Sequence, residues 1–275
     1  MDVPVIDLAH TDDSTMARTR AAVAIDEAFT QAGFLTVVHH GVHPRLVARA
    51  FDAARSYFDG LDDEADSFSV GLGPLAPVNR WPDEPLGFRE HWLAYLDAVG
   101  GLTERLMGLC GLALGVGEQQ FAPVLSQGRL TLRASRHPDE NGGTAGPDRV
   151  TALTVLATDG LSGVEIVEGA DRAGRAWSVD TPPGSFVVTA GHALARWTND
   201  HWRIASHRVT PPSSRPLRGR RTSLALLQHP DADALIDCLP SCVRPDRPAR
   251  YAPITTVELD RVTSERKRSS RTSAA

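Results

Sequence analysis

The chain has 275 residues, of which 41% are hydrophobic and 23% are charged. These are values of a globular protein, and the length suffices to bury a core. The formal net charge of -5 gives no support for a nucleic-acid partner. No apolar run reaches the length of a membrane span, so neither a membrane nor a nucleic acid is expected as a partner.

The cysteines and the chain ends bear on location. Cys110, Cys238 and Cys242 lack the spacing of a zinc site, and an odd number of cysteines favours reduced thiols in a cytoplasm. The residues after Met1 lack the charged and apolar regions of a signal peptide. Residues 261–275, rich in Arg, Ser and Ala, are expected to form a disordered tail.

Helices and short strands alternate in the N-terminal part, about residues 1–128. Apolar spacing and the Gly and Pro positions predict its elements. In chain order these are a strand at 3–8, a helix at 15–31, a strand at 34–38, a helix at 44–65, a region at 70–87 that is mostly loop, and a helix from 88 to about 114. Gly100-Gly101 is a candidate bend in the last helix.

From Arg129 the sequence changes to short β-rich runs separated by Gly and Pro turns. The predicted strands are 130–135, 151–157, 164–167, 185–190, 204–209 and 223–228. Such regular short strands are typical of a β-sandwich or jelly roll. We therefore expect a mainly β fold with flanking helices, forming one domain over residues 1–260 with its β-core at about 129–240.

Several motifs are shared with a known family. The segment from Trp197 to Val209 reads WTNDHWRIASHRV, and Arg221-Thr222-Ser223 lies downstream. Near the N-terminus stand Gly33-Phe34 with His40-Gly41-Val42, then Asn79-Arg80-Trp81-Pro82. Together they closely resemble the isopenicillin N synthase-like Fe(II)/2-oxoglutarate oxygenases. The resemblance spans residues 3 to about 260 and implies a cupin-like double-stranded β-helix core.

The resemblance also implies a site. Non-haem Fe(II) oxygenases hold iron by two histidines and one carboxylate, and His207 matches the distal histidine. Arg221 and Ser223 match the Arg-x-Ser that binds the far carboxylate of the oxoacid. The loop before Arg221 is longer than usual in the family. It also holds three further arginines, which leave the register open: Arg215, Arg218 and Arg220.

The family's His-x-Asp, which supplies the other two iron ligands, is replaced. It should stand just before Leu153, where the chain reads Pro147-Asp148-Arg149. Proline has no side-chain donor atom, and arginine is a permanent cation. At an effective dielectric of about 20, one unit pair about 4 Å apart costs about 4 kcal/mol, and a divalent ion doubles that. The sequence thus predicts a lost metal motif and no bound cofactor.

An alternative with metal stays open. A one-residue slip would bring Asp148 to the carboxylate position. The metal ligands would then be His207, Asp148 and His137, where His137 stands near the family's Tyr in its Tyr-Pro-Pro strand. His192, which follows Gly191 in place of the family's Asp, is the other histidine that could turn toward the metal. In this case the cofactors are Fe(II) and 2-oxoglutarate.

Three functions follow from these readings. The first is a small-molecule biosynthetic enzyme that catalyses a redox-neutral cyclisation, isomerisation, elimination or pericyclic step without metal. Its catalytic groups would be His207, Arg149, His137 and His192, with Arg221 and Ser223 binding an anionic substrate. The second is an Fe(II)/2-oxoglutarate oxygenase with relocated ligands. The third is a non-catalytic binding protein. The sequence gives neither the substrate nor the oligomeric state.

Overall fold

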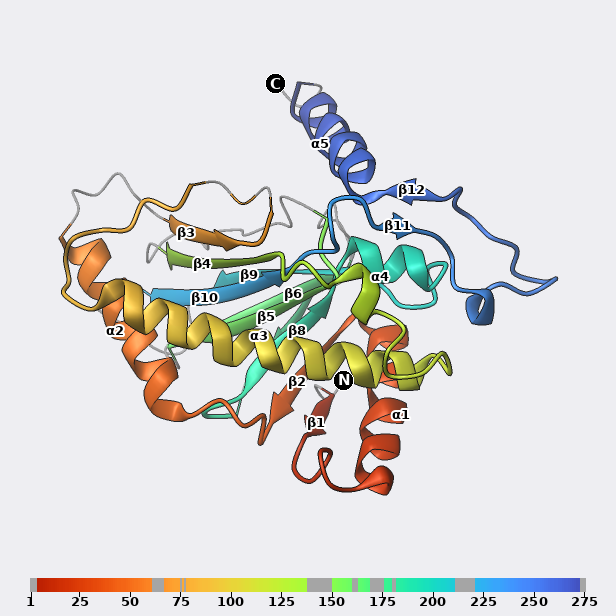
Figure 1. Cartoon of the computed structure of the whole chain (residues 1–275), viewed down its shortest axis with the longest axis horizontal. Helices are drawn as coiled ribbons and strands as arrows, with labels where there is room; N and C mark the ends of the chain where they lie inside the picture. The colour runs from red at the N-terminus through yellow and green to blue at the C-terminus, as the bar shows by residue number, and fades with distance from the viewer. Residues whose placement is uncertain are drawn as a thin grey trace.

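The computed structural model describes residues 4–60, 67–74, 76, 78–137, 150–159, 163–168, 176–179, 182–210 and 221–272. A seven-stranded sheet has the order β1-β2-β8-β5-β10-β4-β3, and a three-stranded sheet has the order β7-β6-β9. The long helix α3 crosses the outer face of the large sheet (Figure 1). Within the described residues, no helix is long and apolar enough to cross a membrane.

The helices and strands have the following bounds. The α-helices are α1 (Thr15–Gln31), α2 (Pro44–Asp59), α3 (Phe88–Ala113), α4 (His192–Trp197) and α5 (Thr256–Thr272). The strands are β1 (Val5–Asp7), β2 (Phe34–Val38), β3 (Ser67–Leu72), β4 (Leu130–His137), β5 (Leu153–Thr158), β6 (Gly163–Glu168), β7 (Ala176–Val179), β8 (Phe186–Ala190), β9 (Ala205–Thr210), β10 (Arg221–Gln228), β11 (Leu235–Ile236) and β12 (Ile254–Thr255).

The two main sheets face each other across an apolar interior. Leu156, Val187 and Ala225 of the large sheet pack in one cluster with Val164 and Ile166 of the small sheet. Among the described strands only β1 and β2 pair in parallel, and the other pairs are antiparallel. This arrangement confirms the predicted mainly β fold with a jelly-roll core, and it excludes a doubly wound parallel sheet.

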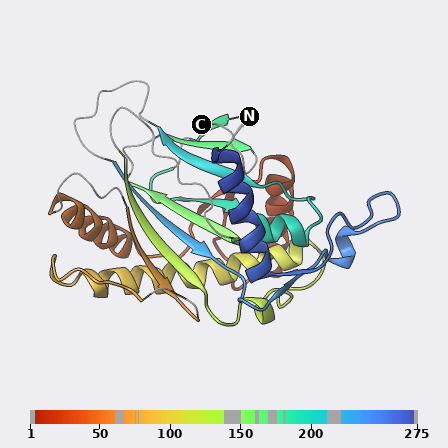
Figure 2. The same ribbon diagram turned by 90° about the horizontal axis from the view of Figure 1, so that it is seen from above.

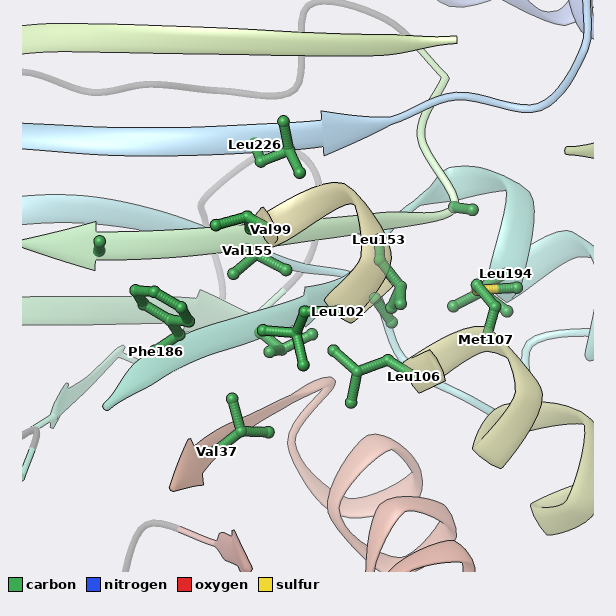
Figure 3. Close-up of a cluster of buried hydrophobic side chains, with 14 of the residues drawn as sticks. Val37, Val99, Leu102, Leu106, Met107, Leu153, Val155, Phe186, Leu194 and Leu226 are labelled. Carbon is green, nitrogen blue, oxygen red and sulfur yellow. The ribbon is translucent and has the colours of Figure 1, made fainter. Parts of the chain in front are cut away.

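The opposite face of the large sheet packs on α3. Leu102 and Leu106 of α3 meet Val155 and Leu226 of the sheet in a cluster of buried side chains (Figure 3). The helix continues through the candidate bend. A Cβ added at Gly100 would lie 3.1 Å from Leu130 Cδ1 of β4, so the glycine allows the close approach of helix and sheet.

Particular residues fix both ends of α1. Ser14 caps α1, because its side chain accepts a hydrogen bond from Ala17 N at 3.2 Å. Gly33 follows the helix with φ +75°, and a Cβ there would lie 2.5 Å from the carbonyl oxygen of Arg203. Only glycine fits this left-handed position against the start of β9.

The observed bounds of α1 and β2 are the predicted ones, and differences occur elsewhere. The helix predicted at 44–65 ends at Asp59, and residues 61–66 lie outside the described part. Strand β3 occupies residues 67–72, part of which was expected to be loop. Residues 261–275 were expected to form a disordered tail, whereas helix α5 extends to Thr272. The extent of a single domain over residues 1–260 stays a prediction.

The strand β3 forms an edge of the large sheet and is held there by a side chain. The Asn79 amide accepts from Gly71 N and donates to Gly71 O, both at 2.8 Å. The side chain thus takes the place of a neighbouring strand's peptide group. Because glycine is a poor strand former, Gly71 and Gly73 lower the strand propensity that the sequence gives this segment.

We expect Asn79→Ala to lower the free energy of unfolding by about 1–3 kcal/mol, since it leaves two half-buried backbone groups without this partner. Chemical denaturation followed by circular dichroism measures the change. Val78→Ala is the matched control, because Val78 is 93% exposed on the same loop and its loss should cost less than about 0.5 kcal/mol. Equal effects of the two substitutions would contradict the role of the amide.

Candidate functional site

The inner face of β10 carries the predicted anion-binding residues. Residues 221, 223, 225 and 227 share one face of the strand, because side chains alternate along it. Ala225 and Leu227 of this face belong to the apolar interior between the sheets. Arg221 and Ser223 therefore face the same interior, at its polar end.

A third side chain joins them from the neighbouring strand. His137 of β4 pairs directly with Arg221 in the register of the two strands. Its Nε2 lies 2.8 Å from Ser223 Oγ. The exposed fractions of Arg221, His137 and Ser223 are 1%, 2% and 3%. We call these three residues the anion cluster.

The chemistry of the anion cluster fits a carboxylate. A guanidinium offers two parallel donors to the two oxygens of a carboxylate, and a hydroxyl adds a third donor. Burial of a cation is unfavourable unless acceptors or an anion surround it. The cluster thus fits the far carboxylate of an oxoacid such as 2-oxoglutarate. The alternative arginines Arg215, Arg218 and Arg220 lie outside the described residues.

Sequence reasoning missed two further polar residues on this face. In the strand register, Ser135 of β4 and Thr158 of β5 stand directly opposite Ser223 on its two sides. The sequence contained a signal for Ser135, because residues two apart in a strand, such as 135 and 137, have their side chains on the same face. What the sequence could not give was the strand order, which alone places β10 between β4 and β5.

The metal ligands stay predictions. His207 lies in β9 and pairs with Ile166 of β6, and the structure describes only its backbone. Pro147, Asp148 and Arg149 lie outside the described residues. Across the described ranges, no three His, Cys, Asp or Glu side chains gather as a metal site.

The two other predicted histidines lie in different surroundings. His137 belongs to the anion cluster, whereas His192 is the first residue of α4. Beside His192, Gly191 N donates to Ala152 O at 2.8 Å and Ala193 N donates to Thr151 O at 2.9 Å. His192 therefore lies next to the start of β5. In the sequence, this start closely follows Asp148.

His40 has a structural role. Its Nε2 donates to Gly184 O at 2.7 Å, and its Nδ1 accepts from Val42 N at 3.2 Å. The ring stacks on Phe186 with centroids 4.2 Å apart. Burial lowers the pKa of His40 by disfavouring the charged form. The neutral ring thus links β2 to the turn before β8.

Two family models match the chain. Residues 3–68 match the N-terminal model of the non-haem dioxygenase in morphine synthesis, and residues 127–230 match the 2OG-Fe(II) oxygenase superfamily.

Curated relatives and solved structures agree with these matches. A 2-oxoglutarate-Fe(II) type oxidoreductase of Aspergillus fumigatus is 25% identical over 93% of this chain and 90% of its own. Proline hydroxylase buaE of Petromyces alliaceus is 30% identical over 69% of this chain and 63% of its own. A full-length Neurospora crassa protein, solved in complex with alpha-KG and 5-formyluracil, has the same fold, with a TM-score of 0.83, 21% identity and 96% of each chain covered.

These findings correct the expectation that no cofactor is bound. The chain matches the model of a superfamily named for 2-oxoglutarate and Fe(II), and the similarly folded Neurospora crassa protein was solved with alpha-KG. The prediction without a cofactor gave too much weight to Pro147 and Arg149, two positions in a chain whose remaining motifs match. The chain belongs to the 2OG-Fe(II) oxygenase superfamily and is an enzyme of that superfamily.

Proposed function

We propose that this protein is an Fe(II)/2-oxoglutarate-dependent oxygenase that acts on a small molecule, with metal ligands relocated from the family's His-x-Asp. The observation that carries the proposal is the buried anion cluster of His137, Arg221 and Ser223. The relatives are oxidoreductases and hydroxylases, which favours a metal-dependent oxidation over a redox-neutral reaction without metal.

The anion cluster supports 2-oxoglutarate as co-substrate. Arg221 would bind the far carboxylate through two donors, while Ser223 adds a hydroxyl and His137 holds that hydroxyl in place. Strands β4 and β10 are paired over eight positions around these residues, so the donors are fixed before the ligand arrives. The apolar residues Leu156 and Ile166 exclude water from the adjoining interior.

For the metal, the candidate ligands are His207 and Asp148, with His137 or His192 as the third. When bound, Fe(II) with 2-oxoglutarate supplies the activation of O₂ for oxidation of the substrate. Of the two third candidates, His137 already contacts Ser223 through Nε2, which favours a role in holding the oxoacid. His192 stands beside the start of β5, which closely follows Asp148 in the sequence, and this favours His192 as the third ligand.

The test of the proposal is coupled turnover. Purified protein is loaded anaerobically with Fe(II) and 2-oxoglutarate, exposed to O₂ with candidate small molecules, and assayed for succinate. Succinate above the protein-free background supports the proposal, and its dependence on Fe(II) separates it from the other readings. Protein that binds neither Fe(II) nor 2-oxoglutarate would overturn it.

The role of His137 gives a sharper prediction. We expect His137→Ala to weaken 2-oxoglutarate binding by about tenfold, the equivalent of one hydrogen bond of about 1.4 kcal/mol, while Mn(II) binding changes little. His192→Ala should have the reverse pattern if His192 is a ligand. Titration calorimetry with each ligand measures both. Loss of Mn(II) binding in His137→Ala but not in His192→Ala would instead make His137 the metal ligand.

A further inference from the structure

We infer that Arg133 of β4 binds a carboxylate of the substrate, so that the oxygenase acts on a small carboxylic acid. This role rests on the proposed function, because it names the class of substrate that the same site takes. Arg133 lies on the inner face of β3 and β4, beside the anion cluster. We call this part of the sheet the polar face, and its residues are Ser67, Ser69, Gly71, Thr131, Arg133 and Ser135.

The strand register puts Arg133 on the same side of the large sheet as the anion cluster. Side chains two positions apart in a strand share a face, so Arg133 and His137 of β4 point to the same side. Arg133 pairs directly with Ala225 of β10, which belongs to the apolar interior between the sheets. On its other side it pairs with Ser69 of the edge strand β3. Arg133 therefore lies between the interior and the edge of the sheet.

The apolar interior ends before it reaches Arg133. Its members come from β2, from β5 to β10 and from Ala32, and none of those within the described ranges lies in β3 or β4. The other face of these two strands is apolar, because Val70 and Leu132 pack in the main core. In Figure 1, β3 and β4 form the upper edge of the large sheet, and Figure 2 views the molecule from above this edge. Ser67 and Ser69 are exposed, so solutes can reach the polar face.

The side chain of Arg133 is suited to a carboxylate. Its Nε donates to Ser69 Oγ at 3.3 Å, which orients the guanidinium toward β3. A guanidinium has five N–H donors in a fixed fork that matches the two oxygens of a carboxylate. Arg133 is half-buried, and solvent ions screen a partly buried pair less than an exposed one. A carboxylate bound here would thus gain more than it would at an open surface.

The charge of the polar face favours a carboxylate over a phosphate. Arg133 is the one Lys or Arg among the six residues of this face. A single cation balances the single charge of a carboxylate. A phosphate monoester carries a charge of about −1.5 to −2 at pH 7 and would call for a second cation. The neighbouring serine and threonine hydroxyls add neutral hydrogen-bonding groups.

Arg133 and the anion cluster occupy separate positions along one strand. Arg133 and His137 are four residues apart in β4, which at about 3.4 Å per residue separates their Cα atoms by about 14 Å. Arg221 stands opposite His137, so the two arginines are as far apart. A substrate at Arg133 and an oxoacid at Arg221 would therefore be neighbours on one face of the sheet, as a reaction between substrate and co-substrate requires.

The experiment compares acids with their own amides, which keep the carbon skeleton and lack the charge. The acids are phenylacetate, cinnamate, octanoate and cyclohexanecarboxylate, and phenyl phosphate is added as a probe for phosphate. The full chain is loaded with Mn(II) and saturating 2-oxoglutarate without O₂, so that the anion cluster is occupied. Ligand-detected nuclear magnetic resonance measures the affinity of each probe. Calorimetry measures the affinity for 2-oxoglutarate, and thermal melting confirms that each variant is folded.

The variants separate charge from structure. Arg133→Gln removes the cation and keeps a side chain that can donate to Ser69, whereas Arg133→Lys keeps the cation. Arg55→Gln is the control. Arg55 lies on α2, on the helical side of the large sheet, and its Nη1 is 3.2 Å from Asp52 Oδ1. Its loss therefore removes one positive charge from the protein without touching the polar face.

We expect wild-type protein to bind at least one acid about tenfold more tightly than its amide, the effect of one charge-assisted pair. In Arg133→Gln this preference should fall to about twofold or less, while Arg133→Lys and Arg55→Gln keep most of it. The affinity for 2-oxoglutarate should stay within about twofold of wild type in all three variants.

Four results would overturn the role of Arg133. They are a wild-type protein that prefers none of the acids, an unchanged preference in Arg133→Gln, a parallel loss of 2-oxoglutarate affinity in that variant, and tighter binding of phenyl phosphate than of phenylacetate. Wild-type protein that binds no 2-oxoglutarate would instead refute the proposed function. The comparison of acids with amides, repeated without 2-oxoglutarate, would then still decide whether Arg133 binds carboxylates.

Discussion

Arg221→Ala should weaken 2-oxoglutarate binding by roughly 10- to 150-fold. The substitution removes a charge-assisted pair worth about 1.5–3 kcal/mol, and each 1.4 kcal/mol corresponds to about tenfold in affinity. Arg221 is 1% exposed, so its pair with the carboxylate forms away from bulk water, where charge-assisted hydrogen bonds are stronger. Calorimetry of 2-oxoglutarate with Mn(II)-loaded protein, without O₂, measures the change.

A second buried arginine provides the control. Arg136 of β4 is 5% exposed, and its Nη1 donates to Phe58 O at 2.9 Å on the other face of the large sheet. Arg136→Met should lower the melting temperature without changing 2-oxoglutarate affinity. Arg221→Lys should recover part of the affinity, because it keeps the charge and loses the two-pronged geometry. If Arg221→Ala binds as tightly as wild type, the oxoacid site involves another arginine, and the loop of Arg215, Arg218 and Arg220 becomes the place to test.

The fold could be predicted where local signals and packing agree. The apolar spacing of residues 15–31 and the β-branched run at 34–38 predict α1 and β2 with their observed bounds, because the left-handed Gly33 marks the junction between them. Strand β3 was harder. Its backbone partners are β4 and the Asn79 side chain, so tertiary pairing rather than propensity makes residues 67–72 a strand.

The candidate site divides in the same way. Arg221 and Ser223 were predicted from a short motif, and the strand register adds His137 beside them. The contacts of Asp260 and His229 with Val150 were beyond prediction, because these residues, far apart in the sequence, meet only in the folded chain. The prediction that no cofactor is bound was wrong. It gave the substituted positions Pro147 and Arg149 more weight than a resemblance spread over nearly the whole chain.

Restoring the family's ligands should strengthen metal binding more than any other change. We expect the double substitution Pro147→His and Arg149→Asp to raise Mn(II) affinity by at least about 100-fold. It adds an imidazole and replaces a cation by a carboxylate. At an effective dielectric of about 20, one unit charge about 4 Å from a divalent ion contributes about 8 kcal/mol, and even a quarter of this energy is about 2 kcal/mol. Titration of Mn(II), followed by electron paramagnetic resonance, measures the gain against wild type.

The single substitutions separate the possible causes of that gain. If Arg149→Asp alone gives most of it, repulsion by the guanidinium limits the wild-type site, which would then bind metal only together with a dianion such as 2-oxoglutarate. If both substitutions are needed, the missing imidazole is the limit, and His207 with Asp148 cannot complete a site alone. Should the double variant bind Mn(II) no more tightly than wild type, positions 147 and 149 do not face the metal. Metal binding would then rest on the relocated ligands alone, and the succinate assay on wild-type protein tests those ligands independently.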